Sequence, residues 1–204
     1  MFDMTPHHDV PDPTPAVEAH LTAAFGEPSG RAGVTFVGTD RIEVLRFGPD
    51  DTGVVRYATL GMSRAPMTDP AAALADPVRG PRAELVLSVR GSQDSVLRPL
   101  AVFAASPQVE GVIVAPGASL DVGGPLWEGA AFTAVLVGEP GGLIADLPLP
   151  EPAEPVRFLP LLPMTAGETA WKRVHGGEAL QERWLRHGTD LRDPRRAAVP
   201  LGAD

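Results

Sequence analysis

Apolar and polar residues follow a helical period near the start of the chain and strand-like runs after it. Val17, Leu21 and Phe25 recur at a spacing of four residues, which predicts a helix that begins at Thr14 and stops at Gly26. Apolar segments bounded by Gly, Pro and Asp then predict strands at 34–37, 41–47 and 54–60. The turn-forming clusters between these strands indicate hairpins.

The pattern continues in the second half of the chain after a Gly- and Pro-rich loop at 61–82, in which an Ala-rich piece at 71–75 predicts one helical turn. The broad apolar surface of 96–105 predicts a helix packed on a sheet, with Pro99 in its first turn. Alternating or apolar runs predict further strands at 84–90, 112–114, 119–122 and 132–137.

A proline-rich connector at 146–155 precedes a mostly apolar strand-like run, 156–162. The Pro152–Pro155 spacing would also suit an SH3 ligand, but a rigid linker between strands explains it better. Pro160 and Pro163 cannot donate a main-chain hydrogen bond. We therefore predict that this strand lies at a sheet edge or ends early.

Two helices are predicted directly after this strand. Thr165 and Glu168 have the spacing of a capping box, and Lys172 stands four residues after Glu168, in the favourable order for an ion pair. We expect Gly176 to end the first helix in the αL conformation. The second helix is predicted at 178–187, with Leu180 and Trp184 on one face. The residues after it are polar and include three arginines.

Composition and charge narrow the class of protein. The chain has 204 residues, 44% hydrophobic and 21% charged, which suits one globular domain. It contains no cysteine, so a disulfide, a thiolate nucleophile and a Cys-type zinc site are excluded. Its net charge of −9 disfavours nucleic acid and favours a basic protein partner, although solubility alone also explains that charge.

No membrane-spanning run or secretory signal is recognisable in the sequence. The longest apolar runs fall short of the ~18–20 residues that a membrane span needs. The opening residues MFDMTPHHDV lack a basic region followed by an apolar one. We therefore expect a cytoplasmic protein that does not bind membranes.

The candidate chemistry is weak. His7, His8, Asp9 and Asp12 are metal-ligand residue types, but they lie in a segment that we expect to be flexible and no second cluster completes a shell. The sequence holds no G-x-S-x-G motif and no phosphate-binding loop, and the Gly-rich residues 138–142 are explained by a turn. We therefore predict no catalytic, cofactor-binding or metal-binding residues and no cofactor.

The remaining aromatic and imidazole side chains also have structural explanations. His175 and His187 flank the last helix without forming an HExxH motif, so helix capping is the better reading of His175. Trp127, Trp171 and Trp184 could line a ligand pocket, yet tryptophans more often anchor a core or its rim.

Four segments in a fixed order carry a resemblance to a known family. They are RYATLGMS (56–63), ELVLSVR (84–90), FTAVLVG (132–138) and FLPLLPMTAGETAWKRVHGGEAL (158–180). In this order they resemble the suppressor of fused-like domain family, over about residues 14–187. The FLPLLP strand followed by its capped helix is the most specific of these marks.

The resemblance implies a fold and a class of function. It implies a single α+β domain with a mixed, largely antiparallel central sheet, packing helices and no enzymatic activity. We accordingly divide the chain into a flexible N-terminus at 1–13, the domain at 14–190 and a polar C-terminal tail at 191–204. The family's animal members bind and restrain transcription factors of the Hedgehog pathway, whereas its bacterial members resemble immunity proteins that neutralise partner toxins.

The leading hypothesis is a bacterial immunity-type protein that binds a basic toxin. Sixteen of its seventeen basic residues are arginine, a bias typical of GC-rich bacterial genomes, which favours the bacterial role. The resemblance does not indicate which residues contact the partner. Two alternatives stay open: a small-molecule-binding or hydrolytic enzyme, and a housekeeping protein of this fold that binds no toxin.

Overall fold

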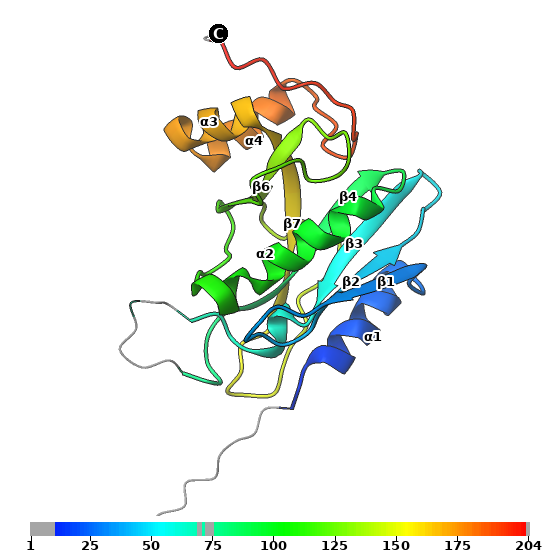
Figure 1. The fold of residues 1–204 in the computed structure, drawn as a ribbon, viewed down its shortest axis with the longest axis vertical. Helices are drawn as coiled ribbons and strands as arrows, with labels where there is room; N and C mark the ends of the chain where they lie inside the picture. Colours follow the sequence, from blue (N-terminus) through cyan, green and yellow to red (C-terminus); the bar gives the residue numbers. More distant parts are fainter. Residues whose placement is uncertain (1–10, 69–70, 72–75, 203–204) are drawn as a thin grey trace, which may run out of the picture.

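The computed structural model describes residues 11–68, 71 and 76–202. Seven strands of this part form one mixed sheet in the order β1-β2-β3-β4-β7-β6-β5, with helices on both faces (Figure 1). The strands are β1 (Gly30–Val34), β2 (Ile42–Phe47), β3 (Val54–Leu60), β4 (Arg82–Arg90), β5 (Ser119–Asp121), β6 (Phe132–Val137) and β7 (Val156–Thr165). The α-helices are α1 (Thr14–Phe25), α2 (Leu97–Glu110), α3 (Ala166–His175) and α4 (Gly177–Arg186), with 3-10 turns η1 (Met62–Arg64) and η2 (Asp94–Val96).

The predicted fold class is confirmed. Neighbouring strands are antiparallel except β4 and β7, which are parallel and pair from Arg82 opposite Val156 to Leu87 opposite Leu161. β1 to β4 follow one another as a meander, and the chain then crosses over through α2, β5 and β6 before β7 joins β4. The parallel pair therefore joins two antiparallel halves at the centre of the sheet.

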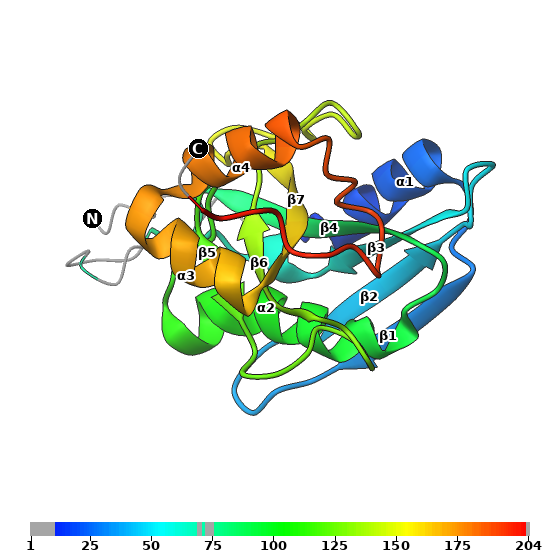
Figure 2. The same ribbon diagram turned by 90° about the horizontal axis from the view of Figure 1, so that it is seen from above.

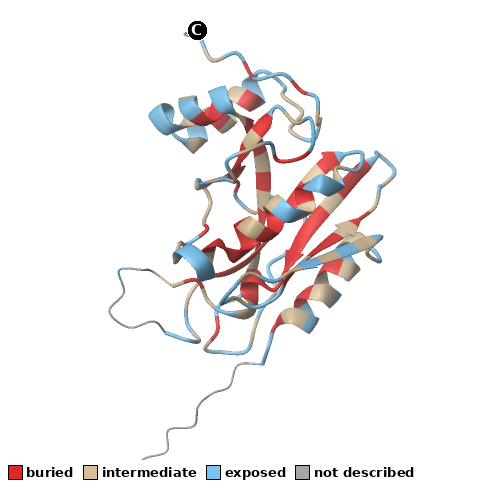
Figure 3. Ribbon diagram, in the orientation of Figure 1, coloured by how far each residue is buried: buried red, intermediate tan, exposed pale blue. Residues whose placement is uncertain are grey.

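Helices cover the sheet on both faces (Figure 2). α2 packs on one face through buried residues such as Leu100 and Phe103, together with the inward side chains of β3, β4 and β7. On the other face α1 covers β2 and β3 through Val17 and Leu21, and α4 covers β6 and β7 through Leu180 and Trp184. Figure 3 shows the buried residues concentrated in the strands and on the inner sides of these helices.

α2 begins and runs as predicted but continues to Glu110 in spite of a second proline. Pro99 lies in its first turn, where no main-chain donor is required. Pro107 lies inside the helix and cannot donate to the carbonyl of Phe103. The hydroxyl of Ser106 donates to that carbonyl at 2.7 Å instead. A buried carbonyl thus keeps a hydrogen-bond partner.

The prediction that the proline-containing strand lies at an edge or ends early is wrong. β7 has ten residues and lies between β4 and β6. The carbonyl of Pro160 faces Gly138, just past the end of β6, and accepts its N–H at 2.8 Å. Pro163 lies beyond the last pair with β4, and its carbonyl accepts from Arg196 at 2.7 Å. Since the N–H and C=O of a strand residue point to the same side, the nitrogen of Pro160 faces the place where β6 has ended, and that of Pro163 lies past the last pair of β7 with β4.

Two other predicted strands are also wrong. The first strand is Gly30–Val34 rather than 34–37, and the side chain of Val37 is fully exposed. β1 is an edge strand whose burial alternates only between intermediate and exposed, so it carries no apolar signal. Residues 112–114 belong to none of the seven strands. Val114 instead fills the core beneath α2.

The two C-terminal helices confirm the capping box and the shared face of Leu180 and Trp184. Gly176 ends α3, but its φ of 92° and ψ of 164° lie outside the αL region, which corrects that part of the prediction. Gly176 is both the C-cap of α3 and the N-cap of α4. The Ala-rich piece at 71–75, apart from Ala71, lies outside the described residues.

Candidate functional site

A groove runs along α2 beside β5, the last strand of the sheet. One part of the groove is a cavity of about 310 Å³. Another part, of about 340 Å³, continues toward the start of the helix and shares Val102 with the first. The apolar lining of the first part includes Val102, Phe103, Val112, Ile113 and Leu120. Ile113 is 39% exposed, so part of this apolar surface is open to solvent.

β5 presents an open strand edge to this groove. It pairs with β6 on one side, where the carbonyl of Ala118 accepts from the N–H of Val137 at 2.9 Å. Because main-chain groups alternate between the two sides of a strand, those of Ser119 and Asp121 face the outer edge. No further strand of the described residues pairs with this edge. It can therefore accept an extended segment of another chain.

Carboxylates flank the groove. Glu110 lies at the C-terminal end of α2, and Asp121 lies at the end of β5. Both residues are exposed, and Asp121 also accepts the N–H of Gly123 at 2.6 Å. Arg98 lines the other part of the groove, so the carboxylates mark only the end beside Ile113. At that end, an apolar cavity with two carboxylates and a free strand edge suits an extended basic peptide with an apolar side chain.

The buried carboxylate of Glu84 holds the TLGMS segment (59–63) in place. Thr59 and Ser63 donate their hydroxyls to it at 2.6 Å each, and the N–H groups of Gly61 and Ser63 donate at 2.9 and 3.0 Å. The guanidinium of Arg82 accordingly donates to the carbonyl of Ser63 at 2.8 Å rather than to Glu84. Glu84 thus organises a turn, and its oxygens are occupied by structural donors.

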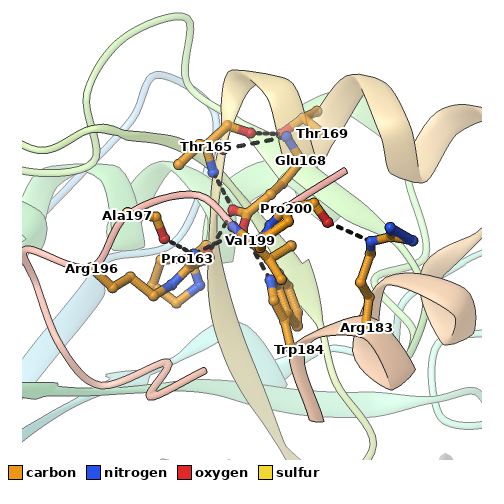
Figure 4. A network of polar contacts seen from close by, with 10 residues as sticks. All are labelled: Pro163, Thr165, Glu168, Thr169, Arg183, Trp184, Arg196, Ala197, Val199 and Pro200. Atoms are coloured by element: carbon orange, nitrogen blue, oxygen red, sulfur yellow. Dashed lines mark hydrogen bonds and ion pairs between the residues drawn. The ribbon is translucent and has the colours of Figure 1, made fainter. Parts of the chain in front are cut away.

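Glu168 is the second buried carboxylate, and it does more than cap α3 (Figure 4). Besides the N–H of Thr165 at 2.8 Å, it accepts from the indole of Trp184 at 3.0 Å and from the N–H of Val199 at 3.0 Å. The guanidinium of Arg196 donates to both its oxygens, at 2.7 and 2.9 Å. Burial raises the pKa of Glu168, but these donors outweigh it, and the pKa lies below its usual value.

The expected ion pair of Glu168 with Lys172 is therefore wrong. Glu168 turns into the core toward Arg196, whereas the ammonium of Lys172 donates to the carbonyl of Gly117 at 2.6 Å. The two groups stand four residues apart on α3 but face different neighbours. Helix spacing places Glu168 and Lys172 near each other, but the packing of the C-terminal segment determines that Arg196 pairs with Glu168.

The C-terminal segment packs against α3 and α4. Arg196 and Val199 are buried, and Leu191 and Leu201 are packed at the edge of the same cluster. Arg183 of α4 donates to the carbonyl of Pro200. Polar composition alone had suggested a tail, but the described part of this segment to residue 202 contributes to the core around Trp184.

The other residues considered from the sequence have structural contacts where they are described. Asp12 accepts from Thr14 and lies 3.4 Å from Arg64, whereas His7, His8 and Asp9 lie outside the described residues. Within the described part, no group of three His, Asp or Glu side chains could hold a metal ion.

The aromatic candidates have similar roles. His175 lies in the last turn of α3 and stacks on Trp171 with ring centroids 4.1 Å apart. Trp127 and Trp184 are buried in the core. None of the helices in the described residues is long and apolar enough to cross a membrane.

One sequence-family model matches most of the chain. The family model of suppressor of fused protein (SUFU) matches residues 38–197. The chain belongs to the SUFU family. This match spans the open β5 edge, both buried carboxylates and Arg196 of the C-terminal segment. The SUFU family is one of protein-interaction domains, and no protein with a curated description matches the chain significantly.

Solved structures of SUFU proteins share the fold. One is a protein of Neisseria gonorrhoeae FA 1090 described as a SUFU homologue, with a TM-score of 0.69, 20% identity, and coverage of 94% of this chain and 99% of that one. A chain of the Sufu–Fu complex has a TM-score of 0.64 and 13% identity, and the match covers 93% of each chain. Drosophila Suppressor of Fused has a TM-score of 0.61 and 13% identity, and the match covers 93% of this chain but 51% of the fly chain.

Proposed function

We propose that this SUFU domain is a non-enzymatic protein that binds a basic partner protein through the groove between α2 and β5. The open edge of β5 beside an apolar cavity carries the proposal. An extended segment of the partner adds a strand to this edge, places an apolar side chain near Ile113, and brings basic side chains toward Glu110 and Asp121.

The wider role that we propose is that of a bacterial immunity protein in the cytoplasm. The partner is then a basic toxin such as a nuclease, which the domain neutralises by covering its surface. The net charge of −9 supports a basic partner, because complementary charge accelerates encounter and suppresses wrong partners. The Sufu–Fu complex supports protein binding as the mode of action in this family.

The buried carboxylates do not support the enzymatic alternative. The oxygens of Glu84 and Glu168 accept from the protein's own donors, and neither residue lines the groove. A hydrolytic or ligand-binding role would instead require convergent polar groups that face a cavity.

The test is co-expression with the protein encoded by the adjacent gene, followed by co-purification at low and high salt. We expect a complex that weakens as salt rises. Ile113→Glu and Ser119→Pro should lower its affinity at least about tenfold, because one charges the cavity and the other blocks the edge. Val109→Glu is the matched control, since Val109 is 57% exposed at the same end of α2 but does not line the cavity.

Three results would count against the proposal. Absence of a complex at every salt concentration would show that the adjacent gene product is not the partner. A complex that is insensitive to salt would show that charge complementarity does not contribute to binding. Equal binding by the Ile113→Glu and Val109→Glu variants would move the interface away from the groove.

A further inference from the structure

α4 lies on the face of the sheet opposite α2 (Figure 2). A second groove runs along this helix. A cavity of about 410 Å³ lies beside the C-terminal half of α4, and one of about 170 Å³ lies beside its N-terminal half. Gln181 lines both, so the two cavities meet at the middle of the helix. The groove has two chemically different ends.

The end beside the C-terminal half of α4 is apolar. Its lining includes Leu162 of β7, Trp184 and Leu185 of α4, and Leu191 of the C-terminal segment. Leu185 is 84% exposed although its neighbours Leu162 and Leu191 are partly buried. A partner's side chain that covers this exposed leucine and enters the apolar cavity beside it would bury apolar surface, which favours binding.

The other end is acidic. Glu178 and Glu139 line the smaller cavity, and Glu182 lines the larger one beside Leu185. Glu139 lies 3.4 Å from Arg157, whereas Glu178 and Glu182 have no ion pair among the residues that the structure describes. Lys172 lies nearby, but its ammonium donates to the carbonyl of Gly117. Two exposed carboxylates one helical turn apart therefore face outward from α4.

We infer that this α4 groove is a second protein-binding surface, whose occupant is a basic amphipathic helix of a partner. Leu185 and Glu178 are seven residues apart, or roughly 10 Å along the axis at about 1.5 Å per residue. A helix laid along α4 repeats its face after about seven residues, so a leucine at the apolar end places a basic residue seven positions away at Glu178. An arginine or lysine between them reaches Glu182.

The charge of the groove selects this occupant over a second copy of the chain. Two copies that met through this face in a two-fold dimer would bring the carboxylates of α4 together in one interface. Of the two arginines of α4, Arg183 donates to the carbonyl of Pro200 and lies over the Trp171 ring. Neither Arg183 nor Arg186 lines either cavity, whereas three carboxylates do.

The experiment uses a synthetic helical peptide of alanine and glutamine that carries two leucines one turn apart and two arginines, each seven residues after one leucine. Nitrogen-15 NMR spectra of the full chain are recorded during titration with this peptide. We expect saturable shifts that gather at α4 and at Thr189 to Leu191. A peptide with glutamates in place of the arginines should bind at least about tenfold more weakly.

Variants of the protein locate the site. Leu185→Ser and the double variant Glu178→Gln, Glu182→Gln should each weaken peptide binding at least about fivefold. Val174→Ser is the control, because Val174 is 78% exposed on α3 and does not line the groove. Folding of every variant is checked from the dispersion of the same spectra.

Several outcomes would overturn the inference. These are shifts that do not saturate, shifts that gather elsewhere, or equal binding by Leu185→Ser and Val174→Ser. A wild-type dimer in sedimentation that Leu185→Ser dissociates would assign the groove to a second copy. The experiment involves neither the β5 edge nor the adjacent gene product, so it can fail or succeed independently of the proposed function.

Discussion

Glu168 and Arg196 form a bidentate ion pair inside the C-terminal cluster, although 28 residues separate them in the chain. Both side chains are almost completely buried, at 0% and 5% exposure. The same guanidinium lies 4.8 Å from the centre of the Phe132 ring and donates to the carbonyl of Pro163. One side chain thus joins the C-terminal segment to α3 and to the strands β6 and β7.

We expect Glu168→Gln to lower the free energy of unfolding by about 3–5 kcal/mol, because the guanidinium of Arg196 then stays buried without its counter-charge. Urea unfolding followed by tryptophan fluorescence measures this loss. The exposed Glu182→Gln variant is the control and should stay within about 0.5 kcal/mol of wild type. A loss below about 1 kcal/mol in Glu168→Gln would contradict a dominant role for the pair.

The same pair predicts an acid-dependent stability. The pKa of Glu168 is lower in the folded chain than its usual value. Its contribution is therefore complete above the unfolded pKa of about 4.3 and is lost as pH falls through the lower folded pKa. The stability difference between wild type and Glu168→Gln should shrink when urea midpoints are compared at pH 6 and then below about pH 4. A constant difference over this range would count against the linkage.

The turn that follows β3 supplies a second stability prediction. Ser63→Ala removes the hydroxyl that donates to Glu84 at 2.6 Å and leaves a buried carboxylate with fewer donors. We expect a loss of about 1–3 kcal/mol in the free energy of unfolding. Ser119→Ala, at an exposed position of β5, should change stability by less than about 0.5 kcal/mol. Equal effects of the two substitutions would refute the role of Glu84 as the centre of this turn.

Tyr57 is the one tyrosine of the sequence, so its ionisation can be followed without interference from another phenol. Burial, with a hydrogen bond from its hydroxyl to Asp94 at 2.9 Å, raises its pKa to about 12. Because the folded pKa is raised, this protonated phenol stabilises the fold at neutral pH and loses that effect as pH rises toward 12. Absorbance at 295 nm should show a midpoint well above 10, and Asp94→Asn should lower it. If the phenol of folded wild type titrates with a midpoint near pH 10, at a pH where the chain has not yet unfolded, that result would contradict the buried hydrogen bond.

The sequence predicted the elements whose signal is local. The helix that begins at Thr14, the strand at 132–137 and the capping box of Thr165 and Glu168 each depend on residues a few positions apart, and the structure confirms them. The resemblance to SUFU proteins, which depended on the order of such segments, is confirmed by the family match.

Errors arose where a distant part of the chain decides the outcome. Pro160 and Pro163 fit inside the sheet because β6 and β4 stop pairing at the right places, which β7 alone does not encode. Helix spacing alone pointed to Lys172 as the partner of Glu168. The packing of the C-terminal segment brings Arg196 to this carboxylate instead. β1 has no apolar alternation because it is an edge strand held by its main chain.

The candidate binding surfaces could not be predicted for the same reason. The groove beside β5 combines side chains of α2 with a strand edge that becomes open only when the order of all the strands is known. The groove along α4 requires Leu162 of β7 beside Leu191, residues with no spacing relationship in the sequence. The local signal in the sequence is Leu185 itself, an apolar residue that follows Trp184 and falls outside the face shared by Leu180 and Trp184.

The parallel pairing of β4 with β7 has a consequence for the order in which the chain is made. While a ribosome synthesises the protein, β1 to β4 emerge first and can form their meander, but the remaining edge of β4 has no partner until residues 156–161 appear. β7 is the last of the seven strands to be made, so the unfinished chain presents the unpaired main-chain edge of β4 until then. A nascent chain of this protein therefore has a long interval in which a chaperone can bind it, and that interval ends when β7 enters the middle of the sheet.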